Sequence, residues 1–183
     1  NEYISSISID DEDAAYFVTK HLIKMGHKRI GVIGGLMDSE VTCARYKGFL
    51  KAMEEKGLPF DFESSYEVSR YSMESGFNAA EALIKKNKSL TAIFTMSDVM
   101  AIGTIRKLTE LGFKVPDDIS VTGFDGLSLG EFYCPRLSTV RQNEEEMIEK
   151  GLDVFIECLE KSKKSVHLYV PFEFVEGESI KKL

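Results

Sequence analysis

The sequence predicts an α/β fold in which a parallel β-sheet is covered by helices on both faces. Short apolar runs alternate with amphipathic stretches along most of the 183 residues. Several of these stretches begin at a capping residue and end at a glycine, as helices do. Repeated strand–helix units give parallel sheets, because neighbouring parallel strands need a long crossover connection. We therefore expect three layers of helix, sheet and helix.

The expected strands are short. The first contains Ile7 and Ile9, which alternate with serines, and this alternation is typical of a strand. The other expected strands cover residues 29–33, 66–68, 91–95, 119–124, 137–140, 166–170 and 172–175.

The expected helices carry apolar residues every three or four positions. The first begins after Asp10 or Asp11, has its apolar face on Ala14, Val18, Leu22 and Met25, and ends at Gly26. The others are one that ends at Gly57, one that begins near Ser72, one from about Asp98 to Gly112 and one from about Asn143 to Lys161.

Composition places the chain among globular proteins, with 43% hydrophobic and 29% charged residues. The net charge of −7 argues against DNA binding through this segment's own surface, since that needs clustered Lys and Arg. No apolar run is long enough to span a membrane, and the first residues lack signal-peptide features. The scattered Cys43, Cys134 and Cys158 fit neither a disulfide framework nor a metal site and favour a reducing compartment. We expect a cytoplasmic protein without membrane contact.

No motif predicts catalysis. Gly34 and Gly35 lack the spacing of a phosphate-binding loop, so a tight turn is the expected reason for them. His21, His27 and His167 form no paired metal motif, and we expect them to cap helix ends or lie at the surface. No nucleophile elbow is present. The sequence therefore predicts no enzyme, no cofactor and no metal.

Polar residues follow the predicted strands at the edge where ligands bind in such sheets. The loops to consider begin near Gly34, Arg70, Met96 and Asp125. Arg45 follows the first of these loops at the start of a helix, where a cation opposes the helix dipole. A ligand or a carboxylate partner would explain it, and a solvated surface arginine is the alternative.

Three more residues are candidates at the same edge. Asp125 can accept hydrogen bonds from ligand hydroxyls or can cap the next turn. Ser97 follows another strand, and Asp98 beside it is expected to cap a helix rather than contact a ligand. Tyr71 can stack on a sugar ring or pack in the core.

Six segments, in this order and spacing, resemble the lactose-repressor and galactose-repressor family of regulators, and the resemblance covers essentially the whole chain. They are residues 21–35 (HLIKMGHKRIGVIGG), 45–49, 91–94, 97–103, 115–125 (VPDDISVTGFD) and 137–142. The resemblance implies a two-lobed fold of the periplasmic-binding-protein-like type I, with an effector held in the cleft. It assigns residues 1–139 and 165–183 to the second lobe. Residues 140–164 are then a crossover helix of the first lobe, which is otherwise largely absent.

The resemblance also implies which residues contact the effector. Arg45 and Asp125 match the main polar contacts, and their chemistry fits, since a guanidinium donates to hydroxyl oxygens and a carboxylate accepts from hydroxyl groups. Tyr71 matches an aromatic residue that stacks on the effector. Ser97 stands where the family usually has Asn, and Gly126 replaces a frequent second Asp. These two departures leave the identity of the effector open.

A homodimer is the second implication, because members of the family pair through second-lobe surfaces. The matching positions are Met100, Ile102, Ile105, Leu129, Phe132 and Tyr133. The loop over residues 126–133 is also too apolar for a solvated loop, which favours an interface independently of the resemblance.

The predicted helix over residues 143–161 carries an apolar stripe that comprises Ile148, Leu152, Phe155 and Leu159. Burying one such side chain is worth roughly 1.5–3 kcal/mol. Without the rest of the first lobe, we expect this helix to pack on another copy of the chain or to fold back on its own lobe.

The sequence thus predicts the effector-sensing and dimerisation domain of a bacterial transcription regulator, with a sugar as the expected effector. Operator DNA would be bound only by an N-terminal helix-turn-helix head that this chain lacks. The alternative is an extracytoplasmic sugar-binding protein of the same fold that serves a transporter. The free cysteines and the regulator-like segments argue against that alternative.

Overall fold

The computed structural model describes residues 5–161 and 165–183, without the side chains of residues 159–161. The side chain of Leu159, which the sequence places on an apolar stripe, therefore lies outside the described part. No helix in this part of the chain is both long and apolar enough to cross a membrane.

The main body of the molecule, here called the lobe, is built on a parallel sheet with the strand order β3–β2–β4–β5. These strands are β2 (Ile30–Gly34), β3 (Tyr66–Val68), β4 (Ala92–Thr95) and β5 (Ser120–Thr122). Every residue of β2, β4 and β5 is buried. Burial on both faces explains why these strands lack the alternating pattern of a half-exposed strand.

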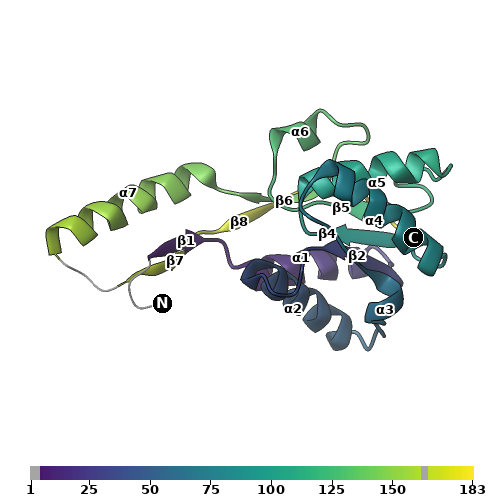
Figure 1. Ribbon diagram of the computed structural model, residues 1–183, viewed down its shortest axis with the longest axis horizontal. Helices are drawn as coiled ribbons and strands as arrows, with labels where there is room; N and C mark the ends of the chain where they lie inside the picture. The colour runs from purple at the N-terminus through teal and green to yellow at the C-terminus, as the bar shows by residue number, and fades with distance from the viewer. Residues whose placement is uncertain (1–4, 162–164) are drawn as a thin grey trace.

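Helices cover both faces of this sheet, which confirms the predicted three-layer α/β fold (Figure 1). Helix α1 packs on α2, and α4 packs on α5, with one pair on each face. The four helices are α1 (Asp11–Lys24), α2 (Glu40–Glu55), α4 (Met73–Lys86) and α5 (Asp98–Glu110). Two single-turn helices were not predicted, namely α3 (Phe62–Ser65) and α6 (Ser128–Glu131).

Each long helix of the lobe starts at a polar residue whose side chain accepts a hydrogen bond from the helix backbone. These capping residues are Asp10, Ser39, Ser72 and Ser97. A capping oxygen satisfies one of the backbone N–H groups that the first turn leaves free, and so fixes where the helix begins. Helices α2, α4 and α5 therefore begin close behind the strands that precede them.

The two helix pairs cross closely at Gly48 on α2 and at Gly103 on α5. A Cβ at Gly48 would contact the carbonyl of Glu12 and, at 2.9 Å, the backbone nitrogen of Tyr16. A Cβ at Gly103 would contact the carbonyl of Met73 and, at 2.9 Å, the backbone nitrogen of Phe77. In both cases the added Cβ would collide with backbone atoms, which cannot move aside as a flexible side chain could.

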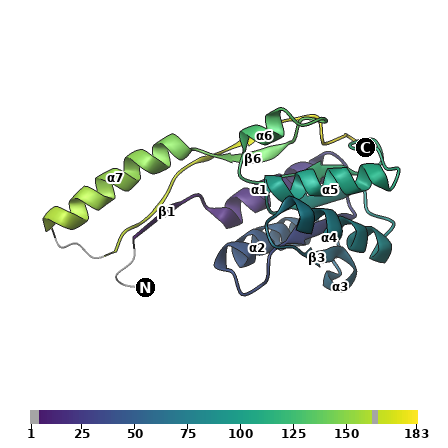
Figure 2. The same ribbon diagram turned by 45° about the horizontal axis from the view of Figure 1, so that its top comes forward.

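A second unit, here called the projection, extends from the lobe (Figures 1 and 2). It contains β1 (Ser6–Ser8), β7 (His167–Tyr169) and α7 (Glu144–Lys161). Strands β1 and β7 pair in parallel, and α7 contacts β1. The sequence assigned residues 6–8 and 167–169 to the lobe, whereas both segments lie with α7.

An antiparallel ladder joins the two units. It consists of β6 (Thr139–Gln142) and β8 (Phe172–Val175), which pair along their whole length. The chain passes between lobe and projection at residues 8–10, 142–144 and 169–172, here called the first, second and third passages.

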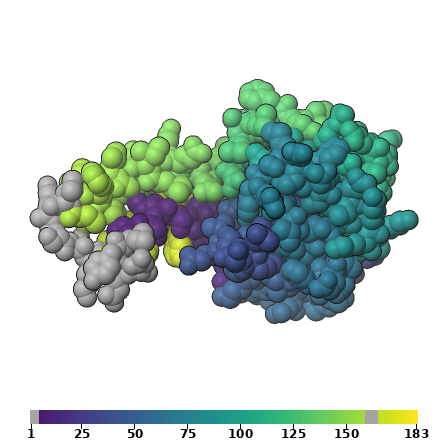
Figure 3. All heavy atoms as spheres, viewed as in Figure 1, coloured from purple at the N-terminus to yellow at the C-terminus, as the bar shows by residue number. Residues whose placement is uncertain are grey.

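Helix α7 does not fold back on its own lobe, so that alternative is wrong (Figure 3). The β6–β8 ladder carries the chain away from the lobe before the helix begins. Its apolar residues Ile148, Leu152 and Phe155 are all more than half exposed. Packing of this stripe on another copy of the chain stays a prediction.

His27 does not lie at the surface, which was one of its two expected roles, because it is buried in the lobe. Its backbone N–H donates to the carbonyl of Leu22 at 3.1 Å, in the last turn of α1. Its Nε2 donates to the carbonyl of Lys181 at 2.9 Å, and its Nδ1 lies 3.1 Å from the hydroxyl of Thr91. Burial lowers the pKa of the imidazole, which favours the neutral ring that can make both bonds. His27 therefore fastens the C-terminal segment to the start of β4.

We predict that Gly48→Ala lowers the free energy of unfolding by about 1–3 kcal/mol, because the added Cβ collides with the backbone of α1. Thermal and urea denaturation followed by circular dichroism measure the change. Gly151→Ala is the matched control, since a Cβ there would meet only Ile7 at an ordinary 3.7 Å. Alanine also favours a helix over glycine by about 0.5–1 kcal/mol. Equal stability of Gly48→Ala and the wild type would contradict the close crossing.

Candidate functional site

The carboxyl ends of the parallel strands gather polar residues at one edge of the sheet. The structure brings Arg45 and Asp125 together there, with Nη1 of Arg45 3.5 Å from Oδ1 of Asp125. Arg45 lies in the second turn of α2, because that helix begins at Glu40. Arg45 therefore does not stand at the start of the helix, as the sequence suggested, and the helix dipole does not oppose its charge there.

Arg45 is only 5% exposed, so the alternative of a solvated surface arginine is wrong. Its Nε donates to Oδ1 of Asp11 at 2.7 Å, and Nη1 donates to the carbonyl of Met96 at 2.5 Å. The guanidinium carbon lies 3.7 Å from the centre of the Phe124 ring. The carboxylate partner expected for Arg45 is thus present. The guanidinium loses its contact with water, and these hydrogen bonds and the charge of Asp11 offset that loss.

Asp125 adopts a left-handed backbone conformation with φ of 113°, which is uncommon outside glycine and frequent at functional sites. Its N–H donates to the carbonyl of Val140 at 2.9 Å, and its Oδ1 accepts from Nε2 of Gln142 at 3.2 Å. Burial raises the pKa of this carboxyl to about 6, while the charge of Arg45 opposes the shift.

Ser97, and not Asp98 as the sequence suggested, is the residue that caps α5. The Ser97 hydroxyl accepts from the N–H of Met100 and caps α5, and the residue is buried. Asp98 is not the cap; its carboxylate accepts from the Thr139 hydroxyl and the Leu127 N–H, each at 2.6 Å. Burial raises the pKa of Asp98 to about 6. Asp98 therefore anchors the loop that follows Asp125.

Tyr71 lies at the rim of the site with its side chain partly exposed, which argues against the core-packing alternative. Its φ is 52°, and its hydroxyl lies 3.0 Å from the Thr42 hydroxyl. A Cβ on Gly35 would contact both Thr42 and, at 2.6 Å, the Tyr71 ring. Gly35 is therefore required by close packing rather than by the expected tight turn.

Two residues of the site were missed by the sequence analysis. Asp11, which pairs with Arg45, is signalled by the sequence only as the start of a helix. Gln142, which contacts Asp125, is signalled only as part of a family segment. Neither is adjacent in sequence to its partner, so no local pattern signals the contact.

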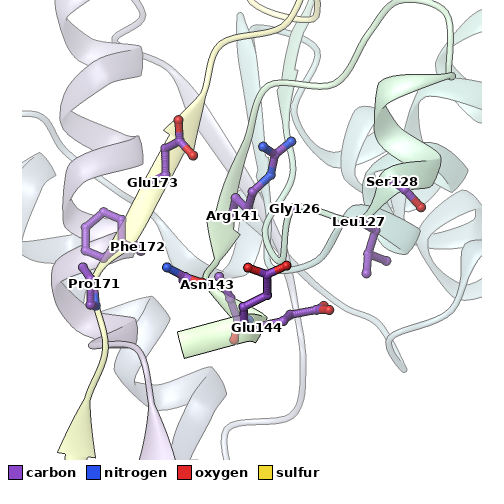
Figure 4. A pocket seen from close by; sticks show the side chains of 11 residues that line it. Gly126, Leu127, Ser128, Arg141, Asn143, Glu144, Pro171, Phe172 and Glu173 are labelled. Carbon is purple, nitrogen blue, oxygen red and sulfur yellow. The ribbon is translucent and has the colours of Figure 1, made fainter. Parts of the chain in front are cut away.

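A hollow of about 640 Å³ opens beside the Asp125 loop, between the β6–β8 ladder and α6 (Figure 4). Gly126 lines it, next to Arg141 on β6 and Glu173 on β8. A Cβ on Gly126 would lie 2.5 Å from Cα of Arg141, and its φ is 75°. This close approach explains why a glycine, and not a second Asp, follows Asp125. Within the described residues, no group of three or more His, Cys, Asp or Glu side chains is placed to hold a metal ion.

Comparison with known proteins identifies the domain. A model of the periplasmic binding protein-like domain family matches residues 19–180. The chain belongs to this family. The fold type that the sequence predicted is thereby confirmed.

Several relatives and solved structures of this periplasmic binding protein-like domain are transcription regulators. The HTH-type transcriptional repressor PurR of Haemophilus influenzae is 35% identical over 180 residues, which are 95% of this chain and 52% of that protein. The chain thus spans about half the length of this curated relative. The resemblance to lactose-repressor-type regulators is confirmed.

Two solved structures superpose closely on the domain. One is a complex of the transcriptional regulator CelR with cellobiose, with a TM-score of 0.91 and 27% identity over 97% of this chain and 54% of that one. The other is a sugar-binding transcriptional regulator of the LacI family from Escherichia coli complexed with phosphate. Its TM-score is 0.85, with 26% identity over 96% of this chain and 63% of that one.

The residues predicted for a dimer interface fall into two groups in this domain. The side chains of Met100, Ile102 and Ile105 are buried, the first and third in the core of the lobe. These two core side chains lie inside the lobe and present no surface to a partner. Leu129 is exposed, Phe132 is 87% exposed and Tyr133 is partly buried.

We predict that the lobe gains stability on mild acidification through Asp125. A carboxyl whose folded pKa is raised to about 6 stabilises the fold at pH values below about 4, and this contribution is lost as the pH rises through 6. From pH 7.5 to 5, the wild type should therefore gain about 1–2 kcal/mol relative to Asp125→Asn. Urea denaturation at both pH values measures the difference. Asp98 titrates in both proteins, and the charge of Asp125 also helps to raise its pKa. Removing that charge therefore changes the pH dependence in the same direction, and identical pH dependence would refute the raised pKa.

Proposed function

We propose that this chain is the effector-sensing and dimerising domain of a DNA-binding transcription regulator that works in the cytoplasm. The pair of the buried Arg45 and the partly buried Asp125 at the strand ends, in a domain whose relatives include repressors, carries this proposal. Transcription regulators are not enzymes, and we propose no catalytic role. The net charge of −7 supports DNA contact through another part of the regulator.

A sugar is the effector class that the site chemistry favours. Among the described residues, Oδ2 of Asp125 accepts no hydrogen bond and Nη2 of Arg45 donates none. A carboxylate and a guanidinium with free positions suit adjacent hydroxyls, and the Tyr71 ring suits the apolar face of a pyranose. The similar CelR structure is a complex with cellobiose.

The effector would change how the lobe and the projection are arranged relative to each other. This change would alter the affinity of a DNA-binding head for its operator. The extracytoplasmic sugar-binding protein is not favoured, because the relatives at 35% identity are transcriptional repressors.

We predict that Asp125→Asn weakens cellobiose binding at least about tenfold, since a hydrogen bond to a charged group is worth about 1.5–3 kcal/mol. Isothermal titration calorimetry with cellobiose, and with glucose for comparison, measures the affinity. Tyr71→Ala should also weaken binding, because its ring is exposed at the rim of the site.

Glu110→Gln is the control for this experiment, since Glu110 pairs with Arg106 at the far end of α5. Arg45 is avoided, because its removal would leave Asp11 and Asp125 unpaired in a buried place. If Asp125→Asn and Tyr71→Ala both bind cellobiose with unchanged affinity, the sugar site does not lie at this edge of the sheet.

We also propose a homodimer formed through the exposed residues Leu129 and Phe132, next to a hollow between α4 and α5 that is lined by Phe77 and Ile102. Phe132→Ser should shift the chain from dimer to monomer in analytical ultracentrifugation, because an exposed aromatic side chain is a typical anchor of an interface. Leu111→Ser, an exposed leucine at the end of α5, serves as control. A dimer that persists in Phe132→Ser would place the interface elsewhere.

A further inference from the structure

Arg45 joins two carboxylates that belong to different parts of the chain. Asp11 is the first residue of α1 and directly follows the first passage between projection and lobe. Asp125 follows β5 and accepts a hydrogen bond from Gln142, at which the second passage begins. Asp11, Arg45, Asp125 and Gln142 therefore form a continuous polar chain from one passage to the other.

The link between Asp11 and Arg45 is the tighter half of this chain. The Nε to Oδ1 distance is 2.7 Å, and both side chains are largely buried. The Met96 carbonyl and the Phe124 ring hold the rest of the guanidinium. Charge-assisted hydrogen bonds in a low-dielectric place are strong and directional, so the position of Asp11 decides where the guanidinium lies.

The link from Arg45 to Asp125 is longer, at 3.5 Å, and depends on that placement. Oδ1 of Asp125 also receives Nε2 of Gln142 at 3.2 Å, and the Gln142 N–H lies 3.4 Å from the Asp125 carbonyl. Moving the guanidinium by a few tenths of an ångström would therefore change its hydrogen bond to the Asp125 carboxylate. It would also change the bond from that carboxylate to Gln142, the residue at which the second passage starts.

We propose that Asp11 is a positioning residue which, through Arg45, fixes Asp125 and so joins the first and second passages in one charged network. The proposal rests on the proposed function only where it concerns ligands: an effector that bonds to Asp125 would act on this network. The network itself is a property of the chain without any ligand.

The test uses the Asp11→Asn variant, which keeps an acceptor for Nε but removes the charge. Nuclear magnetic resonance of the labelled chain follows the Arg45 Nε–H, the Gln142 side-chain amide and the titration of the Asp125 carboxyl. We expect the Gln142 amide signals to shift, although residue 142 does not touch residue 11. We also expect the pKa of Asp125 to fall, because the negative charge of Asp11 helps to raise it.

Glu12→Gln is the matched control, since it removes the neighbouring ion pair between α1 and Lys47 of α2, at 2.7 Å. A general loosening of the helix pair would move the Asp125 and Gln142 signals in both variants, and that result would overturn the proposal. Signals of Gln142 and Asp125 that stay at their wild-type positions in Asp11→Asn would overturn it as well.

Gln142→Met tests the same network from its other end and leaves Asp11, Arg45 and Asp125 in place. Loss of the amide should shift the Arg45 Nε–H resonance, and an unchanged resonance would count against a continuous network. Neither variant requires a ligand. A failure here is therefore distinct from a failure of the calorimetric test of sugar binding.

Discussion

Arg45 carries a charge that the lobe buries almost completely, and this charge constrains the edge of the sheet at which the parallel strands end. Its partners come from three elements: Asp11 at the start of α1, the carbonyl of Met96 behind β4, and Asp125 behind β5. The Phe124 ring covers one face of the guanidinium. Leaving a buried charge without its partner costs about 3–5 kcal/mol. Loops that are independent in sequence are therefore held in one arrangement by a single side chain.

The close helix crossing and the buried ion pair depend on each other. Gly48 lies one turn after Arg45 on α2, and a Cβ there would touch the Glu12 carbonyl, next to Asp11. Only a glycine lets α1 approach so closely, and only a close approach brings the short Asp11 side chain within 2.7 Å of Nε. A wider crossing would leave the guanidinium without its first partner. The packing of the helix pair thus sets the electrostatics of the site.

Local patterns in the sequence predict what is local in the structure. Capping residues and apolar periodicity predict the four long helices of the lobe, and the strand ends correctly place Arg45 near Asp125. The Asp11–Arg45 contact could not be predicted, because it depends on how closely two helices cross. For the same reason, apolar positions such as Met100 suit a core and an interface equally well, and only the packing of α4 on α5 decides between them.

The lobe and the passages that lead to the projection are held by different forces. One continuous apolar core holds the lobe together. The passages, by contrast, are extended segments tied by backbone hydrogen bonds, such as that from the Val170 N–H to the Ser8 carbonyl. Extended segments resist bending less than packed helices do, so hinges form in them. Asp125 is linked to the second passage because it accepts a hydrogen bond from the side chain of Gln142. A ligand that binds Asp125 would therefore act next to a segment at which lobe and projection are joined.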